Sequence, residues 1–249
     1  MKKQIRICHL YPDILNLYGD IGNVITLQKR LTNRGIDCTI DNISVKDTLY
    51  VENYDIFFIG GGQDFEQEIL LEDLLVVKKT LIKKAIDENK TFLAICGEYQ
   101  LLGNYYKTWD GTVLEFVGAL NVNTIGDKKR MIGDYIFSCE DEKGCFDVIS
   151  FENHSGKTFL SSDVLPLGKV ITGYGNNGQD KTEGARYKNV FASYGHGPLL
   201  PKNPRLADLI IKTSLNEKYG TIDLVDLNDE LEIKANNIML ERVKCHTKK

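Results

Sequence analysis

The sequence lacks the marks of secreted, zinc-binding and membrane-spanning proteins. None of its six cysteines forms a Cys-x-x-Cys pair, which argues against a zinc ribbon or a thioredoxin motif. No stretch approaches the roughly 18 apolar residues of a membrane span, and the apolar run at 4–10 is too short for a signal peptide. The net charge of −4 gives no electrostatic reason to expect nucleic acid or an anionic membrane as a partner. We therefore expect a cytoplasmic protein with free thiols.

The first hundred residues alternate between strand-like and helix-like segments. Strand-like segments lie at 4–10, 37–43, 54–62 and 91–95, and the one at 54–62 is expected to be buried. Asp20 is expected to cap a helix that ends at Gly35, and a second helix is expected at 67–89. Their apolar stripes are Val24, Leu27 and Leu31 in the first, and Leu71, Leu75, Ile82 and Ile86 in the second. This alternation predicts an α/β fold with a mostly parallel central sheet and helices on both faces.

The middle of the chain has a different character, because short strand-like pieces at 112–122, 130–138 and 146–150 are separated by glycine-rich and charged turns. This pattern predicts an antiparallel insertion rather than further strand–helix units. A strand at 189–197 and two terminal helices follow, one after Pro204 and one from about 229. In the last helix we expect Leu231, Ala235 and Ile238 to pack on the protein's own sheet rather than on a partner. No linker or repeat is visible, so residues 1–249 are predicted to form a single domain.

Cys96 stands at the junction of the predicted strand at 91–95 and the helix-like stretch at 98–106. A nucleophile between a strand and a helix is typical of a nucleophile elbow, in which a sharp turn raises the side chain above the sheet. Backbone N–H groups at the start of the following helix favour the thiolate, which is the reactive form. The remaining five cysteines have no such setting, and most of the cysteines are expected to be small buried apolar residues.

Two further features lie at predicted strand ends, where active sites of parallel sheets are found. The glycine turn Gly60–Gly62 follows one strand and His196 ends another. Together with Cys96 they supply a nucleophile, a general base and backbone donors for an oxyanion. Each has an ordinary alternative: the glycines are also compatible with a simple turn, and His196 with a structural histidine. His154 is the second candidate for the base.

These residues resemble the class I glutamine amidotransferases, in which a glycine turn and a cysteine elbow precede a histidine by about a hundred residues. The resemblance implies a flavodoxin-like fold and attack of Cys96 on the side-chain amide of glutamine, with His196 as base and then acid. It also implies that Gly61 and Gly97 form the oxyanion hole. The family usually ends in His-x-Glu, but here His196 is followed by Gly-Pro, as in the cobyric-acid-synthase-like branch. No orienting carboxylate is visible.

Within that branch the sequence resembles the glutaminase subunits of lipid II isoglutaminyl synthases. The motifs that carry this resemblance lie at 15–23, 55–67, 95–103, 151–156, 173–177 and 195–204. The resemblance implies a heterodimer with a MurT-like Mur ligase subunit, which uses ammonia to convert D-glutamate of the lipid II stem peptide to D-isoglutamine. It places ATP and magnesium on that partner and no cofactor or metal on this chain. It also implies that Arg130, otherwise read as a surface arginine, binds the α-carboxylate of glutamine.

One departure lies beside the nucleophile, where Glu98 replaces the family's usual glycine. A glutamate suits the first turn of a helix, but its charge also opposes ionisation of a nearby thiol. Three alternative functions stay open: an amidotransferase subunit for another ligase such as a cobyrinate amidating enzyme, a non-catalytic regulatory protein on a related fold, and a cysteine peptidase. Because no carboxylate is seen behind His196, we expect weak glutamine hydrolysis until a partner binds.

Overall fold

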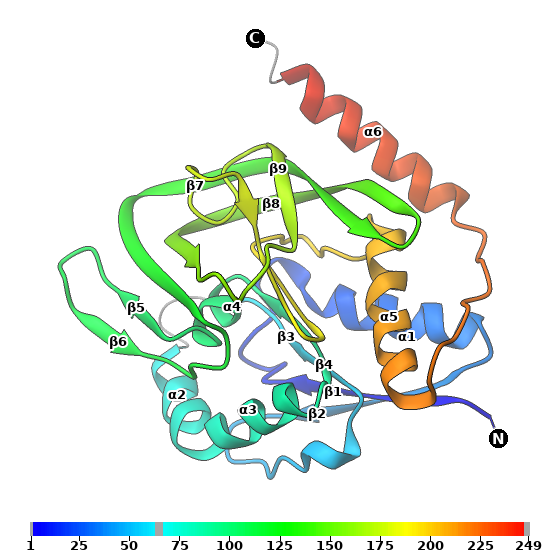
Figure 1. Cartoon of the computed structure of the whole chain (residues 1–249), viewed down its shortest axis with the longest axis horizontal. Helices are drawn as coiled ribbons and strands as arrows, with labels where there is room; N and C mark the ends of the chain where they lie inside the picture. The colour runs from blue at the N-terminus through cyan, green and yellow to red at the C-terminus, as the bar shows by residue number, and fades with distance from the viewer. Residues whose placement is uncertain (1, 63–66, 247–249) are drawn as a thin grey trace.

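A flavodoxin-type sheet forms the centre of the protein, whose computed structural model describes residues 2–62 and 67–246 (Figure 1). Its strands are β1 (Gln4–Leu10), β2 (Asp37–Ile43), β3 (Ile56–Ile59), β4 (Thr91–Ile95), β11 (Ala185–Tyr187) and β12 (Val190–Ser193). The order is β11-β12-β4-β3-β1-β2, and only β11 runs antiparallel to its neighbour. The five parallel strands therefore have the 2-1-3-4-5 order of flavodoxin-like folds. The predicted fold class is confirmed.

Helices cover both faces of this sheet, as predicted. On one face lie α1 (Ile21–Asn33) and α5 (Pro204–Tyr219), and on the other α2 (Gln67–Glu72), the π-helical turn η3 (Asp73–Lys78) and α3 (Lys79–Asp87) (Figure 1). The second predicted helix, at 67–89, is thus interrupted at η3. Asp73 and Lys78 are both buried and form an ion pair. They are five residues apart, a spacing that a π-helical turn brings onto one side of the helix.

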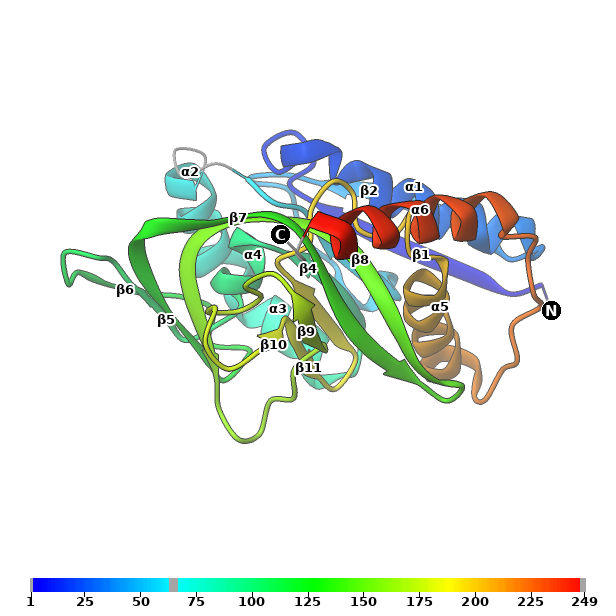
Figure 2. The same ribbon diagram turned by 90° about the horizontal axis from the view of Figure 1, so that it is seen from above.

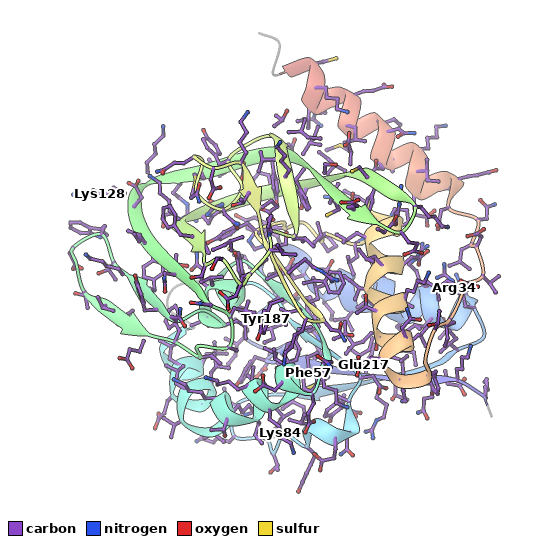
Figure 3. The ribbon with its side chains drawn as sticks, viewed as in Figure 1. Arg34, Phe57, Lys84, Lys128, Tyr187 and Glu217 are labelled. Carbon is purple, nitrogen blue, oxygen red and sulfur yellow. The ribbon has the colours of Figure 1, made fainter. Side chains whose placement is uncertain are left out.

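Phenylalanines fill the interior of the central sheet. Phe57 of β3 (Figure 3) lies opposite Phe92 of β4, and their rings stack with centroids 4.7 Å apart. On the other face of the sheet, Leu27 and Leu31 of α1 pack in one core cluster with α5.

Two short helices, η1 (Leu17–Gly19) and η2 (Val51–Asn53), lie in the connections. Within residues 2–62 and 67–246, no helix is long and apolar enough to cross a bilayer.

The insertion is a second sheet built around a long hairpin. Its strands are β5 (Tyr105–Lys107), β6 (Val113–Glu115), β7 (Val122–Asp141), β8 (Gly144–Leu160), β9 (Gly168–Thr172) and β10 (Thr182–Glu183). All of its pairings are antiparallel except that between β5 and β7. The charged run predicted as a turn is instead a β-bulge in β7, between Gly126 and Met131. Lys128 lies on the outside of this bulge, with its Nζ 4.2 Å from the ring centre of Trp109 (Figure 3).

The two sheets share one core cluster, which contains Phe58 of the first sheet and Tyr135 and Phe137 of the second. The assignment of residues 1–249 to a single domain stays a prediction. Residues 63–66, part of the glycine-turn motif at 55–67, lie outside the described residues.

The predicted inward face of the last helix is wrong. Helix α6 (Glu230–His246) packs against β7 and β8 through Met239, Leu240 and Val243 (Figure 2). Leu231, Ala235 and Ile238 are exposed instead. Polar contacts set this rotation of the helix: Arg30 of α1 binds Asp208 and Asp229, and Asn236 of α6 donates to the Lys202 carbonyl. Arg34 holds the preceding segment through the Val225 carbonyl (Figure 3).

Candidate active site

Cys96 occupies a strained turn between β4 and the short helix α4 (Gly97–Leu101). Its φ is 56° and its ψ is −107°, a conformation that is unfavourable for a residue with a side chain. The turn is held because the Cys96 N–H donates to the Ser193 carbonyl at 2.8 Å, at the end of the neighbouring strand β12. This is the predicted elbow. Helix α4 has only five residues, so support for a thiolate comes from first-turn N–H groups such as that of Gly97 rather than from a long helix.

Cys96 opens onto a cavity of about 450 Å³ between the two sheets. The cavity is lined by Leu17, Tyr18, Gly62, Cys96, Gly97, Gln100, Leu101, Tyr106, Leu114, Phe116, Arg130, Asn153, His154, Ser155 and Gly156. Its walls combine apolar side chains with a guanidinium, amides and backbone groups. Such a lining suits a small polar molecule with a carboxylate.

His196 lies three residues after the end of β12 and is completely buried. Its N–H donates to the Phe151 carbonyl at 2.8 Å, and its own carbonyl accepts from the Ser150 hydroxyl at 2.9 Å. Burial alone lowers the pKa of His196, but the negative charge of Cys96 and the carboxylate of Asp20 outweigh it and raise the pKa to about 10. The imidazolium is therefore favoured beside a Cys96 thiolate, which is the reactive pair of cysteine hydrolases.

Asp20 supplies the carboxylate that the sequence pattern did not reveal. The predicted helix cap is wrong, because Asp20 has helical backbone angles and makes no side-chain capping bond. The Asn16 side chain accepts the Ile21 N–H instead. Asp20 is completely buried, and its Oδ2 lies 3.4 Å from Nδ1 of His196. The two residues are 176 positions apart, so only the fold brings them together.

The glycine turn fits between Asp20 and His196. The Gly61 N–H donates to Oδ2 of Asp20 at 2.9 Å. A Cβ at Gly61 would stand 2.7 Å from Cε1 of His196, so any side chain there would displace the imidazole. The turn is therefore a packing requirement of the site, not only a chain reversal. Its oxyanion role stays a prediction, and in this structure the Gly61 N–H already has a partner.

His154 lines the cavity from β8 and is also buried. Its ring stacks on Tyr194, with centroids 3.6 Å apart, and its Nδ1 lies 2.8 Å from the Gly156 carbonyl. Because a carbonyl only accepts, Nδ1 is the donor in this bond, and Nε2 lies 3.8 Å from the Glu152 carboxylate. Of the two candidate bases, His196 thus lies beside Asp20, whereas the ring of His154 is stacked on Tyr194.

Arg130 reaches the cavity from the bulge of β7. Its Nε donates to Oδ1 of Asn153 at 2.9 Å and its Nη2 donates to the Asn153 carbonyl at 3.4 Å, and the side chain lines the cavity. Asn153 in turn donates to the Tyr18 hydroxyl at 2.5 Å. The ring of Tyr18 lies 5.0 Å from that of His196. The structure therefore places the predicted substrate arginine on the same cavity as Cys96.

Two buried glutamates lie next to the elbow. Glu98 is 1 % exposed in the first turn of α4. Glu183, which sequence reasoning missed, accepts from the Ser193 hydroxyl at 2.7 Å and from the Tyr194 N–H at 3.0 Å. Burial raises the pKa of Glu183 to about 7, although its hydrogen bonds oppose this. It supports the strand end that holds Cys96. Within residues 2–62 and 67–246, no three His, Cys, Asp or Glu side chains are grouped as metal ligands.

Comparison with known proteins identifies the family of the chain. Residues 6–204 match the family model of the CobB/CobQ-like glutamine amidotransferase domain. Solved structures that resemble the fold include PurLQS and a glutamine amidotransferase, both from Thermotoga maritima, with TM-scores of 0.56 and 0.55 at 16 % identity. The alignments cover 87 % and 96 % of this chain, and 99 % and 97 % of those chains.

Two relatives are similar over most of their length. The GatD subunit of the glutamine-hydrolysing lipid II isoglutaminyl synthase of Streptococcus pneumoniae is 44 % identical over 87 % of this chain and 83 % of its own. The GatD subunit of Staphylococcus aureus is 39 % identical over 96 % of both chains. The cobyric acid synthase of Clostridium tetani is 28 % identical, and the alignment covers 66 % of this chain and 39 % of that protein. The chain thus belongs to the CobB/CobQ-like glutamine amidotransferases and is a glutamine-hydrolysing amidotransferase.

Proposed function

We propose that this chain is the glutaminase subunit of a lipid II isoglutaminyl synthase. It releases ammonia from glutamine and supplies it to a MurT-like Mur ligase subunit. That partner amidates D-glutamate of the lipid II stem peptide to D-isoglutamine, a step of peptidoglycan synthesis. The observation that carries the proposal is the similarity to two GatD subunits over 83 % and 96 % of their own lengths.

The proposed reaction uses Cys96 and His196 as a pair. The Cys96 thiolate attacks the side-chain amide carbon of glutamine, and the carbonyl oxygen becomes an oxyanion. The His196 imidazolium gives its proton to the leaving nitrogen, so ammonia departs and a γ-glutamyl thioester stays on Cys96. Neutral His196 then takes a proton from water, which attacks the thioester and releases glutamate. The thiolate and the imidazolium are restored, and no cofactor of this chain is consumed.

The Gly97 N–H is the proposed oxyanion donor on the elbow, because the first N–H groups of a helix have no partner within it. Gly61 is proposed as the second donor. It can serve only by exchanging its present bond to Asp20, since that carboxylate already accepts its N–H. Gly62, the next residue of the glycine turn, lines the cavity.

Replacing Arg130 with methionine is expected to raise the KM for glutamine about 10- to 100-fold with little change in kcat. The reason is that a charge-assisted hydrogen bond to the α-carboxylate is lost equally from the bound substrate and from the transition state. Steady-state assays of ammonia release measure both constants. Lys128→Met is the matched control. Lys128 is a cation in the same bulge, but its side chain lies over the ring of Trp109. An unchanged KM for Arg130→Met would rule out its proposed role.

The partner and its location are part of the same proposal. ATP and magnesium are expected on the ligase subunit, where the carboxylate of D-glutamate is activated. This chain is expected to work in the cytoplasm, where the free thiol of Cys96 stays reduced. The expectation of weak hydrolysis without the partner now has less support, because Asp20 stands behind His196.

The test is a reconstituted amidation of lipid II. The chain is co-purified with the ligase subunit and supplied with ATP and glutamine labelled with ¹⁵N in its side-chain amide. We expect the label in D-isoglutamine, and we expect hydrolysis to increase when the partner is present. A Cys96→Ala complex should lose amidation from glutamine but keep it from ammonium chloride. If the wild-type complex releases ammonia but does not amidate lipid II, the amidated product is a different one.

The second candidate function, amidation of a cobyrinate, has weaker support. The similarity to cobyric acid synthase covers only 39 % of that protein, at 28 % identity. The chain therefore matches GatD subunits nearly end to end but a minor part of this larger enzyme. Incubation of the complex with a cobyrinate in place of lipid II tests this alternative in the same assay.

A further inference from the structure

Residues 15–23 form a brace around the candidate active site, and the proposed reaction assigns them no role. The Leu17 N–H donates to the Gly61 carbonyl at 2.8 Å, so the brace holds the glycine turn. Oδ1 of Asn23 accepts the Leu200 N–H at 2.8 Å, so it also holds the loop that carries His196. A Cβ at Gly22 would stand 2.4 Å from Cγ of Pro198. Helix α1 thus begins in direct contact with the histidine loop.

Asp20 lies at the centre of this brace. Its Oδ2 accepts the Gly61 N–H at 2.9 Å and lies 3.4 Å from Nδ1 of His196, while its Oδ1 has no hydrogen-bond partner among the described residues. Both side chains are 0 % exposed. A carboxylate without solvent is stable only beside a positive group or good donors. The single hydrogen bond from the Gly61 N–H is not enough to stabilise this buried carboxylate. A positively charged His196 supplies the remaining stabilisation.

We propose that Asp20 is a positioning residue that fixes the ring orientation and the protonated state of His196, and so keeps Cys96 ionised for attack. This inference rests on the proposed function of Cys96 and His196. In the usual family ending, the carboxylate lies two residues after the histidine. In this chain, the carboxylate of Asp20 at the start of α1 takes that place. The same carboxylate contacts His196 and the Gly61 N–H, so one group holds both the base and the glycine turn.

The separation of 3.4 Å indicates the size of the effect. It is an ion-pair distance rather than a short hydrogen bond, so the contribution is mainly electrostatic. In serine proteases, where the corresponding aspartate is closely bonded to histidine, its change to asparagine lowers kcat about 10⁴-fold. A smaller loss, about 10- to 100-fold, is expected here.

The groups that face His196 come from separate elements. Cys96 reaches it from the elbow and Asp20 from the start of α1, and both raise its pKa. The half-exposed ring of Tyr18, also in the brace, lies 5.0 Å from the imidazole. Lys202 approaches the same loop, but its Nζ is bonded to the Gly197 carbonyl at 3.1 Å. Removing the charge of Asp20 is therefore expected to lower the pKa of His196.

The test compares wild type, Asp20→Asn and Asp141→Asn in two assays across pH. One is steady-state glutamine hydrolysis and the other is alkylation of Cys96 by iodoacetamide, which needs no glutamine. For Asp20→Asn we expect kcat to fall about 10- to 100-fold, KM to change less than about twofold, and the alkaline limb of the hydrolysis profile to move at least about one pH unit lower. Alkylation of Cys96 at neutral pH should become slower, because less of the thiol is ionised. Asp141 is the matched control, since its carboxylate is 8 % exposed and paired with Arg205 away from the cavity.

An Asp20→Asn protein with wild-type kcat and an unmoved alkaline limb would overturn the proposal. If this variant does not fold, ¹⁵N-histidine NMR of the wild type decides: a protonated Nδ1 of His196 through neutral pH supports the proposal, and an unprotonated one overturns it. The two hypotheses fail separately. A wild-type complex without glutamine hydrolysis would refute the proposed function. The alkylation and NMR experiments would still test the role of Asp20, because they do not depend on glutamine hydrolysis.

Discussion

Cys96→Ala is expected to reduce glutamine hydrolysis by at least about 10⁴-fold, because the substitution removes the atom that forms the thioester. The cavity and its other walls stay in place, so glutamine binding should be retained. Ammonia release measures the first effect, and calorimetric titration with glutamine measures the second. Cys96→Ser should be nearly as inactive, since a hydroxyl is a far weaker nucleophile than a thiolate. Undiminished ammonia release from either variant would refute Cys96 as the nucleophile.

A third substitution separates the strain of the elbow from its chemistry. The φ of 56° at Cys96 is unfavourable for alanine as well as for cysteine, whereas glycine adopts it readily. Strain of this kind is on the order of 1–3 kcal/mol. Cys96→Gly should therefore melt at a higher temperature than Cys96→Ala while being equally inactive. A lower melting temperature for the glycine variant would show that the elbow is not strained.

His196→Asn should lower kcat for glutamine nearly as much as loss of Cys96, because nucleophile and base act as one unit. The cause is the loss of the proton donor to the leaving ammonia. His154→Ala is the matched control on the same cavity, and it should keep most of the activity because its ring is stacked on Tyr194. If His154→Ala is the more damaging change, His154 is the base and the present assignment is wrong.

The pH dependence of stability gives an independent check on His196. Its pKa is raised in the folded protein from the ordinary 6.5 to about 10, against the effect of burial, by Cys96 and Asp20. The folded state therefore binds a proton that the unfolded state has lost between these two values. The stabilising effect of His196 should be fully present below pH 6.5 and disappear as the pH rises toward 10. Denaturant unfolding of wild type and His196→Asn should show a difference that shrinks over this range.

Local patterns were sufficient for much of the fold. The strands at 4–10, 37–43 and 91–95 were predicted with their observed bounds, because each is a short strand-like segment bounded by turn or helix signals. The buried face of the last helix was predicted wrongly, because α6 is only weakly amphipathic. Its rotation about its own axis is set by the contacts of Asn236 and by the Arg30–Asp229 pair. The long hairpin of β7 and β8 was predicted only in pieces, because its charged and glycine residues resemble turns when the partner strand is unknown.

The sequence by itself determined which residues are the candidates, Cys96, His196 and the glycine turn, because each is marked by its immediate neighbours along the chain. Only the tertiary structure revealed the carboxylate behind His196. Asp20 has the local signature of a helix cap, and it meets the imidazole because α1 begins at the edge of the sheet where β12 ends. Contacts between residues 176 positions apart depend on how the helices and strands pack, and no pattern of neighbouring residues records that packing.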